Sequence, residues 1–410
     1  MPPEVVVIGA GAAGIIASWR AAQLGAKVLL LEKNPRIGTK ILISGGGKCN
    51  ITHDGDLEDL LHAFRPAEAR FIRPACYRFT NREIVNMLTS RGLEVYTRPD
   101  GRIFPVRQTA KDVVAILASY LEEAGVEVRL STTVKRIAHE AGRVAGVEVA
   151  EGLIPCSKVI LAVGGSSYPG AGTTGDGYPW AKELGHTVVK VRAALAPIYL
   201  QIDDRWPDER AGIALRDILL KARQGKEIAR WRGDLLFTHH GVSGPTVLGV
   251  SRVVAERIAE GPVTLEVDLV PDMPHEATLA NLEAWIKANP RKGLAAYAER
   301  YVPERLARFV FESGKEPASQ LSQKAKNRAV EAIKAWPLGQ VRTIPLEKGE
   351  VVAGGVGLDE VDPHTMRSLK CKGLYLCGEI LDVAGPVGGY NLQAAFATGF
   401  VAGESAAREP

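Results

Sequence analysis

Cysteine is scarce in this chain, and long apolar runs are missing from it. The sequence has five cysteines, an odd number with no C-x-x-C pair among them: Cys49, Cys76, Cys156, Cys371 and Cys377. They suit a reducing compartment better than a disulfide framework, and they exclude chemistry that needs two neighbouring thiols. No apolar stretch is long enough to cross a membrane. The histidines, cysteines and acids lack the spacing of a metal site, so we expect no metal.

The rest of the composition is typical of a soluble enzyme. With 410 residues, 46% hydrophobic and 24% charged, the chain can bury a large core and is expected to form two or three domains. We interpret the apolar run at the N-terminus as a strand and not as a signal peptide, because it lacks a basic flank and runs into glycines. These features predict a cytoplasmic protein.

A buried strand that turns into a helix is predicted near the N-terminus. Val5 to Ile8 is apolar and is followed by Gly9, Gly11 and Gly14 in the spacing G-x-G-x-x-G. In such a turn the glycines permit the bend, leave room for a pyrophosphate and let the helix pack on the strand. A second apolar run ends in Glu32, where a carboxylate can bond both ribose hydroxyls. The pattern predicts a dinucleotide site and leaves NAD and FAD both open.

Three consecutive glycines follow at residues 45–47. Such a run costs much chain entropy, so we expect a ligand that needs bare backbone there. Ser44 and Lys48 flank the glycines, and Lys48 would place a cation where phosphates or a reduced flavin carry negative charge. A flexible linker is the alternative, although the preceding residues 41–43 are apolar. No second G-x-G-x-x-G follows a strand, so we expect no separate NAD(P)H domain.

These motifs resemble those of the aminoacetone oxidase-like flavoproteins, a group of FAD-dependent oxidoreductases that also includes bile-acid reductase-like members. The family motif S-G-G-G-[RK]-C-N matches Ser44 to Asn50. Further matching blocks are Gly101–Val106, Gly164–His186, Leu236–Pro245, Ala353–Val356 and Gly373–Gly403. The resemblance is weakest between about Gly261 and Gly339. It implies an α/β fold with FAD as the cofactor.

The implied architecture is discontinuous. We expect residues 1–188 and 342–410 to form one Rossmann-like FAD-binding domain built from both chain ends. Residues 189–270 are expected to form an inserted β-rich, barrel-like substrate domain, and residues 271–341 a small helical domain, with helical signals from about His275 to Leu338. Between residues 291 and 334 the chain has ten Lys or Arg against five Glu. We favour solvated helices over a nucleic-acid face there, because aromatic residues are sparse.

The resemblance also implies which residues contact FAD. Glu379, and after it Asp382, would bond the ribityl hydroxyls or the pyrophosphate, while a helix opening at Gly389 would face the pyrimidine edge of the flavin. Val134 would offer its backbone to the adenine from a strand at Val134 to Ile137. The expected contacts are Gly9, Gly11, Ala13, Gly14, Glu32, Lys33, Lys40, Ser44, Gly45, Gly46, Gly47, Lys48, Cys49, Asn50, Val134, Gly164, Gly165, Gly378, Glu379, Asp382, Gly389, Tyr390, Asn391 and Gln393.

Two residues are candidate catalytic groups. His239 falls on a recurrent position of the family and could exchange protons near neutral pH, although a histidine that braces its loop is the simpler interpretation. Tyr390, beside the expected flavin, is the other candidate. Asp176 is expected either to border the flavin channel or to cap a helix. The loop at residues 384–387 departs from the family pattern, so substrate preference stays open.

We expect a hydride to pass between flavin N5 and a small organic substrate held between the two domains. The first hypothesis is oxidation of an amine or amino-ketone with oxygen as acceptor. The second is NAD(P)H-dependent reduction of an enone-type substrate by a nicotinamide that binds transiently. An alternative of another class is an RNA-binding, tRNA-modifying flavoprotein. The oligomeric state and the catalytic base stay open.

Overall fold

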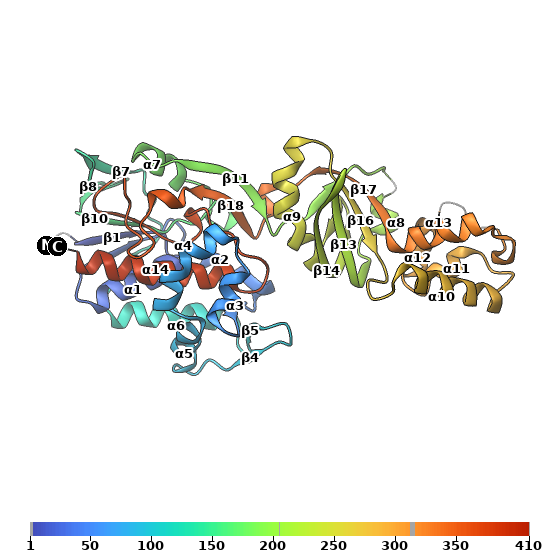
Figure 1. Ribbon diagram of the computed structural model, residues 1–410. Helices are drawn as coiled ribbons and strands as arrows, with labels where there is room; N and C mark the ends of the chain where they lie inside the picture. Colours follow the sequence, from blue (N-terminus) through green and yellow to red (C-terminus); the bar gives the residue numbers. More distant parts are fainter. Residues whose placement is uncertain (1–2, 205, 312–315, 410) are drawn as a thin grey trace. The chain divides into compact units, whose positions relative to one another are not determined.

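The computed structural model describes residues 3–204, 206–311 and 316–409. The chain divides into two compact units (Figure 1): the first holds the residues up to Val191 together with those from Val351 onwards, and the second holds residues 192–350. Both chain ends therefore contribute to one α/β unit, which confirms that part of the predicted fold class. Glu312 and Lys315, two of the charges counted above, lie outside the described residues.

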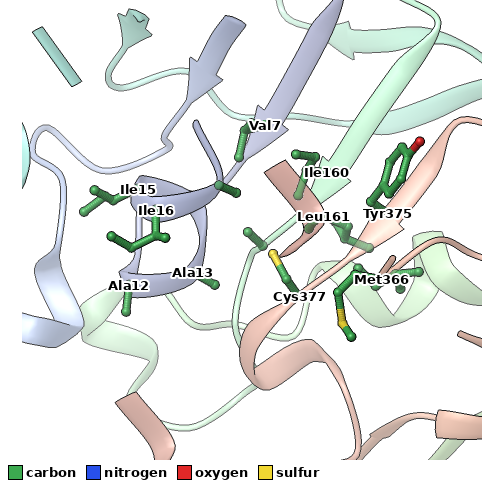
Figure 2. Packing of buried hydrophobic residues seen from close by; sticks show 14 of the residues in the cluster. Val7, Ala12, Ala13, Ile15, Ile16, Ile160, Leu161, Met366, Tyr375 and Cys377 are labelled. Atoms are coloured by element: carbon green, nitrogen blue, oxygen red, sulfur yellow. The ribbon is translucent and has the colours of Figure 1, made fainter. Parts of the chain in front are cut away.

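A five-stranded parallel sheet forms the centre of the first unit, in the order β19-β10-β1-β2-β6. Its strands are β1 (Val5–Ile8), β2 (Val28–Leu31), β6 (Glu127–Arg129), β10 (Lys158–Leu161) and β19 (Leu374–Leu376). β1 and β2 are buried along their whole length instead of alternating, as a parallel sheet covered on both faces requires. Figure 2 shows part of this core, with Val7, Ile160 and Tyr375 on neighbouring strands.

Two long helices, α1 (Ala12–Gln23) and α14 (Tyr390–Arg408), lie side by side (Figure 1). Small residues allow their close approach, since a Cβ built at Gly399 would lie 2.3 Å from the Ala13 carbonyl oxygen. At the other end of the contact, Glu404 of α14 accepts from Arg20 of α1 at 2.6 Å. The C-terminal helix is thus part of the same core as the first glycine turn.

The remaining helices and strands of the first unit surround this sheet. Two of the helices, α5 and α6, begin at capping residues, Thr80 and Thr109. The strand predicted to begin at Val134 begins only at Arg136, because Ser131, with a φ of 51°, turns the chain just after β6. These elements are α2 (Thr39–Ile43), β3 (Thr52–His53), α3 (Leu57–His62), α4 (Pro66–Arg78), α5 (Asn81–Thr89), β4 (Val95–Thr97), β5 (Arg102–Pro105), α6 (Ala110–Glu123), β7 (Arg136–Glu140), β8 (Arg143–Val149), β9 (Gly152–Pro155), α7 (Gly177–Glu183), β11 (Val188–Ala194) and β18 (Val351–Val356).

The second unit is built on a closed barrel, as the sequence predicts, in the order β12-β15-β14-β13-β16-β17. Closure leaves no unpaired sheet edge. Its strands are β12 (Ile198–Leu200), β13 (Ala214–Gln224), β14 (Lys226–Thr238), β15 (Gly241–Ser243), β16 (Thr264–Asp268) and β17 (Trp336–Thr343). The helices of this unit are α8 (Trp206–Arg210), α9 (Pro245–Arg257), α10 (His275–Ala288), α11 (Leu294–Ala298), α12 (Glu304–Val310) and α13 (Gln323–Lys334).

The predicted helical stretch extends too far at its C-terminal end. Trp336 and Leu338 are buried while Pro337 between them is exposed, which is the alternation of a strand. These residues begin β17, which pairs with β16 and closes the barrel. None of the helices in the described ranges is long and apolar enough to span a membrane.

Candidate functional site

The glycine turn between β1 and α1 leaves an open space at the start of the helix. A Cβ at Gly9, whose φ is +97°, would lie 2.6 Å from the Ala162 carbonyl oxygen, and one at Gly14 would lie 1.8 Å from the Gly9 carbonyl oxygen. A Cβ at Gly11 would meet no atom within 4 Å. Gly9 and Gly14 therefore permit the packing of strand and helix, while Gly11 leaves the room that a pyrophosphate needs beside a helix N-terminus.

Glu32 is held at the end of β2, next to this turn. Its side chain is buried, and its two carboxylate oxygens accept from the backbone amides of Ala10 at 2.7 Å and Asn34 at 2.8 Å. These two bonds fix the carboxylate and leave it further lone pairs. It can accept hydrogen bonds from ribose hydroxyls, as the sequence predicts for this position.

Lys40 and Glu379 meet although 339 positions separate them in the sequence. Lys40 Nζ lies 2.5 Å from Glu379 Oε2 and 3.1 Å from Ser167 Oγ. The other oxygen of Glu379 accepts from Val352 N at 3.0 Å. A Cβ at Gly165 would lie 3.2 Å from Glu379 Cδ. The structure thus brings the paired glycines after β10, Lys40 and the acid after β19 into one cluster.

Two other acids of this region also have defined partners. Lys33 Nζ lies 2.6 Å from Asp176 Oδ2, and Asp382 Oδ1 accepts from Gly354 N at 2.8 Å. Burial by itself would raise the pKa of Asp176, but the bonds from Lys33 and Thr174 lower it overall. Asp176 occupies the N-cap position of α7 without making a side-chain cap. The prediction that the Asp176 side chain caps the helix is therefore wrong, because its carboxylate pairs with Lys33 instead.

The triple-glycine segment forms an exposed turn. Gly45, Gly46 and Gly47 all have positive φ, at 56°, 68° and 86°, and a Cβ at Gly46 would meet no atom within 4 Å. Lys48 is exposed beside them. Cys49 is fully buried, and this burial raises the pKa of its thiol to about 12. The turn offers bare backbone and a cation to a ligand, whereas Cys49 packs as a neutral thiol.

The chain after this turn is joined to the first turn of α14. In the amide orientation that satisfies both neighbours, Asn50 accepts from Gly389 N at 3.0 Å and donates to the Thr52 carbonyl at 3.3 Å. A Cβ at Gly389 would lie 2.5 Å from the Thr52 carbonyl carbon. Gln393 is fully buried between Thr52 Oγ1 and the Phe79 carbonyl, each at 2.9 Å. These contacts fix the helix start against β3.

Asn391 holds the loop in which this chain departs from the family pattern. Its Oδ1 accepts from Gly385 N at 2.8 Å, and its Nδ2 donates to the carbonyls of Gly385 at 3.0 Å and Pro386 at 3.3 Å. The loop is therefore fixed by the helix that follows it. The side-chain amide of Asn391 is occupied by these bonds. Only the backbone of Asn391 is therefore available to a ligand at the start of α14.

His53, on β3, is a site residue that the sequence reasoning missed. Its ring centroid lies 4.7 Å from that of Tyr390, which also has Phe64 at 6.1 Å on another side. Burial lowers the pKa of His53. The available signal was its place three residues after Asn50, the last residue of the glycine motif. The ring contact itself could not be predicted, because Tyr390 lies far along the chain.

His239 and Val134 have roles that stay predictions. His239 is exposed in the turn between β14 and β15 of the second unit, and its catalytic role stays a prediction. Val134 is buried before β7 in the first unit. Within the described ranges, no group of three or more His, Cys, Asp or Glu side chains could hold a metal ion.

The residues of the first unit fit an FAD molecule. The open space beside Gly11 leaves room for a pyrophosphate, and the open space beside Gly46 leaves room for a ring system. The buried hydroxyl of Tyr178 has no hydrogen-bond partner among the described residues. Burial, and then the charges of Glu379 and Asp382, raise the pKa of that hydroxyl. A polar group of a bound ligand would give this buried hydroxyl the hydrogen-bond partner that it lacks.

The chain is similar to known proteins along nearly its whole length. A family model described as the HI0933-like protein Rossmann domain matches residues 3–405. The chain is 30% identical over 412 residues to a ribosomal RNA dihydrouridine synthase of Haemophilus influenzae, with 99% of each chain covered. It is 32% identical over 416 residues to a 3-dehydro-bile acid delta(4,6)-reductase of Clostridium scindens, covering 99% of this chain and all of that one. A solved 3-ketosteroid delta1-dehydrogenase from Sterolibacterium denitrificans shares the fold, with a TM-score of 0.55, 15% identity and 99% coverage of both chains.

Proposed function

Because this chain belongs to the HI0933-like family of FAD-dependent oxidoreductases, we propose that it reduces a carbon–carbon double bond conjugated to a carbonyl group. One observation carries the proposal. Two relatives that cover the whole chain have different names, yet both names describe this chemistry. A delta(4,6)-reductase acting on a 3-keto compound reduces double bonds conjugated to the ketone, and dihydrouridine is uridine whose C5=C6 bond, conjugated to C4=O, has been reduced.

Residues of the first unit would hold the cofactor. Gly11 and Glu32 would take the pyrophosphate and the adenosine ribose, the pair of Lys40 and Glu379 the central part of the molecule, and the start of α14 the flavin ring. Bound FAD supplies the hydride. The positive end of α14 and its free amides favour negative charge on the ring. We propose that NAD(P)H binds only transiently to reduce it, in line with the single dinucleotide motif of the sequence.

Amine oxidation with oxygen was the first hypothesis from the sequence and remains a prediction. Neither of the two relatives above is named as an amine oxidase. We therefore rank reduction of a conjugated double bond ahead of it. The two functions differ in the direction of electron flow, which makes them separable by experiment.

Uridine in RNA is a second candidate substrate. The name of the H. influenzae relative favours it, and so does the charge of the second unit. Lys326 and Lys334 pair with Glu283 and Asp268. Four other cations of this region are exposed and make no ion pair with any residue that the structure describes: Arg291, Lys292, Lys324 and Arg328. Unpaired cations of this kind can bind phosphates.

The test begins with the purified protein and the visible spectrum of its bound FAD. Under anaerobic conditions, NADH, NADPH and a panel of amines are each added, and bleaching of the flavin is followed. Bleaching by a nicotinamide, then reoxidation by 2-cyclohexen-1-one, is the expected result. Bleaching by amines alone would overturn the proposal. Salt-dependent binding of ribosomal RNA, with dihydrouridine formed in it, would select the RNA substrate.

A further inference from the structure

The rings of His53 and Tyr390 pack against each other in a tilted arrangement, with their centroids 4.7 Å apart and their planes at 41°. The Tyr390 hydroxyl makes no hydrogen bond with any described residue, and neither does His53 Nε2. Both side chains are only partly exposed. Both atoms are therefore available to bond a ligand.

The histidine of this pair presents an acceptor. His53 Nδ1 lies 3.2 Å from the Asp54 carbonyl oxygen. Because a carbonyl oxygen only accepts, Nδ1 must carry the proton, so the neutral ring leaves a bare Nε2. Burial, with help from Arg102, lowers the pKa of His53, while Asp100 and Asp54 act in the opposite direction. The neutral form with a free Nε2 thus prevails near neutral pH.

The tyrosine of the pair presents a donor. Burial, and then the charges of Asp100 and Asp59, raise the pKa of Tyr390. The phenol consequently keeps its proton at neutral pH. Its hydroxyl can donate to an acceptor on a ligand that lies beside the two rings.

Glycines hold the two rings in place. A Cβ at Gly388 would lie 2.5 Å from Tyr390 Cε2 and 3.6 Å from His53 Cδ2, and a Cβ at Gly101 would lie 2.0 Å from His53 Cε1. The backbone thus packs against both rings where a larger residue would push them away. The contacts that join β3 to the start of α14 also bring His53 and Tyr390 together. Its donor and acceptor are therefore preorganised at the proposed ring end of the cofactor site.

We propose that Tyr390 and His53 are catalytic residues that interconvert the ketone and enolate forms of the substrate. Tyr390 donates a hydrogen bond to the carbonyl oxygen, and His53 Nε2 transfers a proton at the adjacent α-carbon. A carbonyl oxygen and its α-carbon are two bonds apart, so the reaction needs a donor and an acid–base group side by side. This inference rests on the proposed function and assigns the residues that act on the substrate.

The reduction balances as follows. A hydride adds to the β-carbon, the π electrons of the double bond move towards the carbonyl, and the resulting enolate oxygen is stabilised by Tyr390. His53 Nε2 takes a proton from solvent, and the imidazolium so formed gives this proton to the α-carbon and returns to its neutral form. In reverse, Nε2 removes an α-proton from a saturated ketone and leaves the enolate, with no change of oxidation state.

This last step provides a test that needs no hydride transfer. The oxidised holoenzyme is incubated with cyclohexanone in deuterated water, and loss of the α-protons is followed by proton NMR. The native protein is expected to catalyse the exchange, and His53→Gln and Tyr390→Phe are each expected to slow it about 100-fold. His139→Gln is the matched control, because that histidine lies on β7 of the same unit with 33% of its side chain exposed.

The visible spectrum of bound FAD is recorded first for every variant. If His53→Gln does not retain FAD, His53→Asn takes its place. Exchange that is unchanged in folded His53 and Tyr390 variants overturns the inference.

A second measurement separates the inference from the proposed function. The FAD is reduced by light with EDTA as the electron donor, and its reoxidation by 2-cyclohexen-1-one is followed anaerobically. Reoxidation without any exchange overturns the enolisation by His53 and Tyr390 and leaves the proposed function standing. Exchange without reoxidation overturns the proposed function instead. If neither reaction occurs, both are overturned.

Discussion

The protonation state of His53 sets how its reactivity should vary with pH. Its folded pKa lies below the usual value near 6.5, so the bare Nε2 is lost only as pH falls through that lowered value. We expect the rate of α-proton exchange to be constant around neutral pH and to decline under acidic conditions. The NMR assay at a series of pH values measures this. A rate that keeps climbing above neutral pH would point to another base.

Gly11 and Gly14 differ in what a side chain would meet, and this difference predicts opposite phenotypes. Gly11→Val should leave the fold intact and abolish FAD binding, because its Cβ meets no protein atom. Gly14→Ala should lower the free energy of unfolding by about 1–3 kcal/mol, because its Cβ would lie 1.8 Å from the Gly9 carbonyl oxygen. FAD content by visible absorbance and the Tm by circular dichroism distinguish the two. Full FAD occupancy in Gly11→Val would contradict the assigned site.

Local patterns carried most of what could be predicted at single positions. The strand and the glycine turn at Gly9, Gly11 and Gly14 could be predicted, because strand and glycines follow one another along the chain, while the FAD contacts of these glycines and of Glu32 stay predictions. His53 could not be assigned, because its meaning comes from Tyr390 on a distant helix. The partner of Asp176 was missed for the same reason, since Lys33 lies 143 positions away. The sequence gives the type of each residue and its neighbours along the chain, whereas the contact partners of its side chain depend on the tertiary fold.

At the scale of elements, one buried carboxylate joins three helices. Glu404 of α14 is 4% exposed and accepts from Arg20 of α1 and Arg78 of α4, with Arg408 at 3.0 Å. Glu404→Gln would leave three guanidinium groups close together without their counter-charge. We expect a loss of about 3–5 kcal/mol in the free energy of unfolding, measured by urea titration.

The matched control for this prediction is Glu123→Gln. Glu123 pairs with Arg91 at the surface with 60% of its side chain exposed. Exposed pairs contribute about 0–1 kcal/mol. Equal losses in the two variants would show that burial of Glu404 is unimportant.

A strand with a strong pattern was predicted close to its observed bounds. β1 is the example, because its unbroken apolar run is visible in the sequence itself. The start of β17 was missed because Trp336 and Leu338 continue the apolar character of α13, and only pairing with β16 makes them a strand. Barrel closure is a long-range property that the short run of residues does not encode.

For the whole molecule, the division of the chain predicts that the second unit can be removed. Residues 192–350 form one continuous segment with its own buried core, and the ends of the segment are neighbours, since Glu350 N donates to the Leu195 carbonyl at 3.0 Å. We expect a short glycine-serine linker in place of residues 192–350 to leave a folded first unit that still binds FAD. Its visible spectrum and FAD stoichiometry provide the measurement. The same shortened chain carrying Gly11→Val is the control and should be colourless.

The packing of α14 against α1 also has a consequence for the order in which the protein is made. Synthesis runs from the N-terminus, so α1 leaves the ribosome long before the segment that contains Gly399 and Gly403 exists. Throughout that interval the face of α1 that these glycines cover is bare, while the continuous barrel segment can already fold. The cofactor site is completed only when α14 arrives. Chains interrupted before α14 should therefore emerge without flavin and with an uncovered apolar surface, so that yellow colour marks the molecules whose synthesis reached that helix.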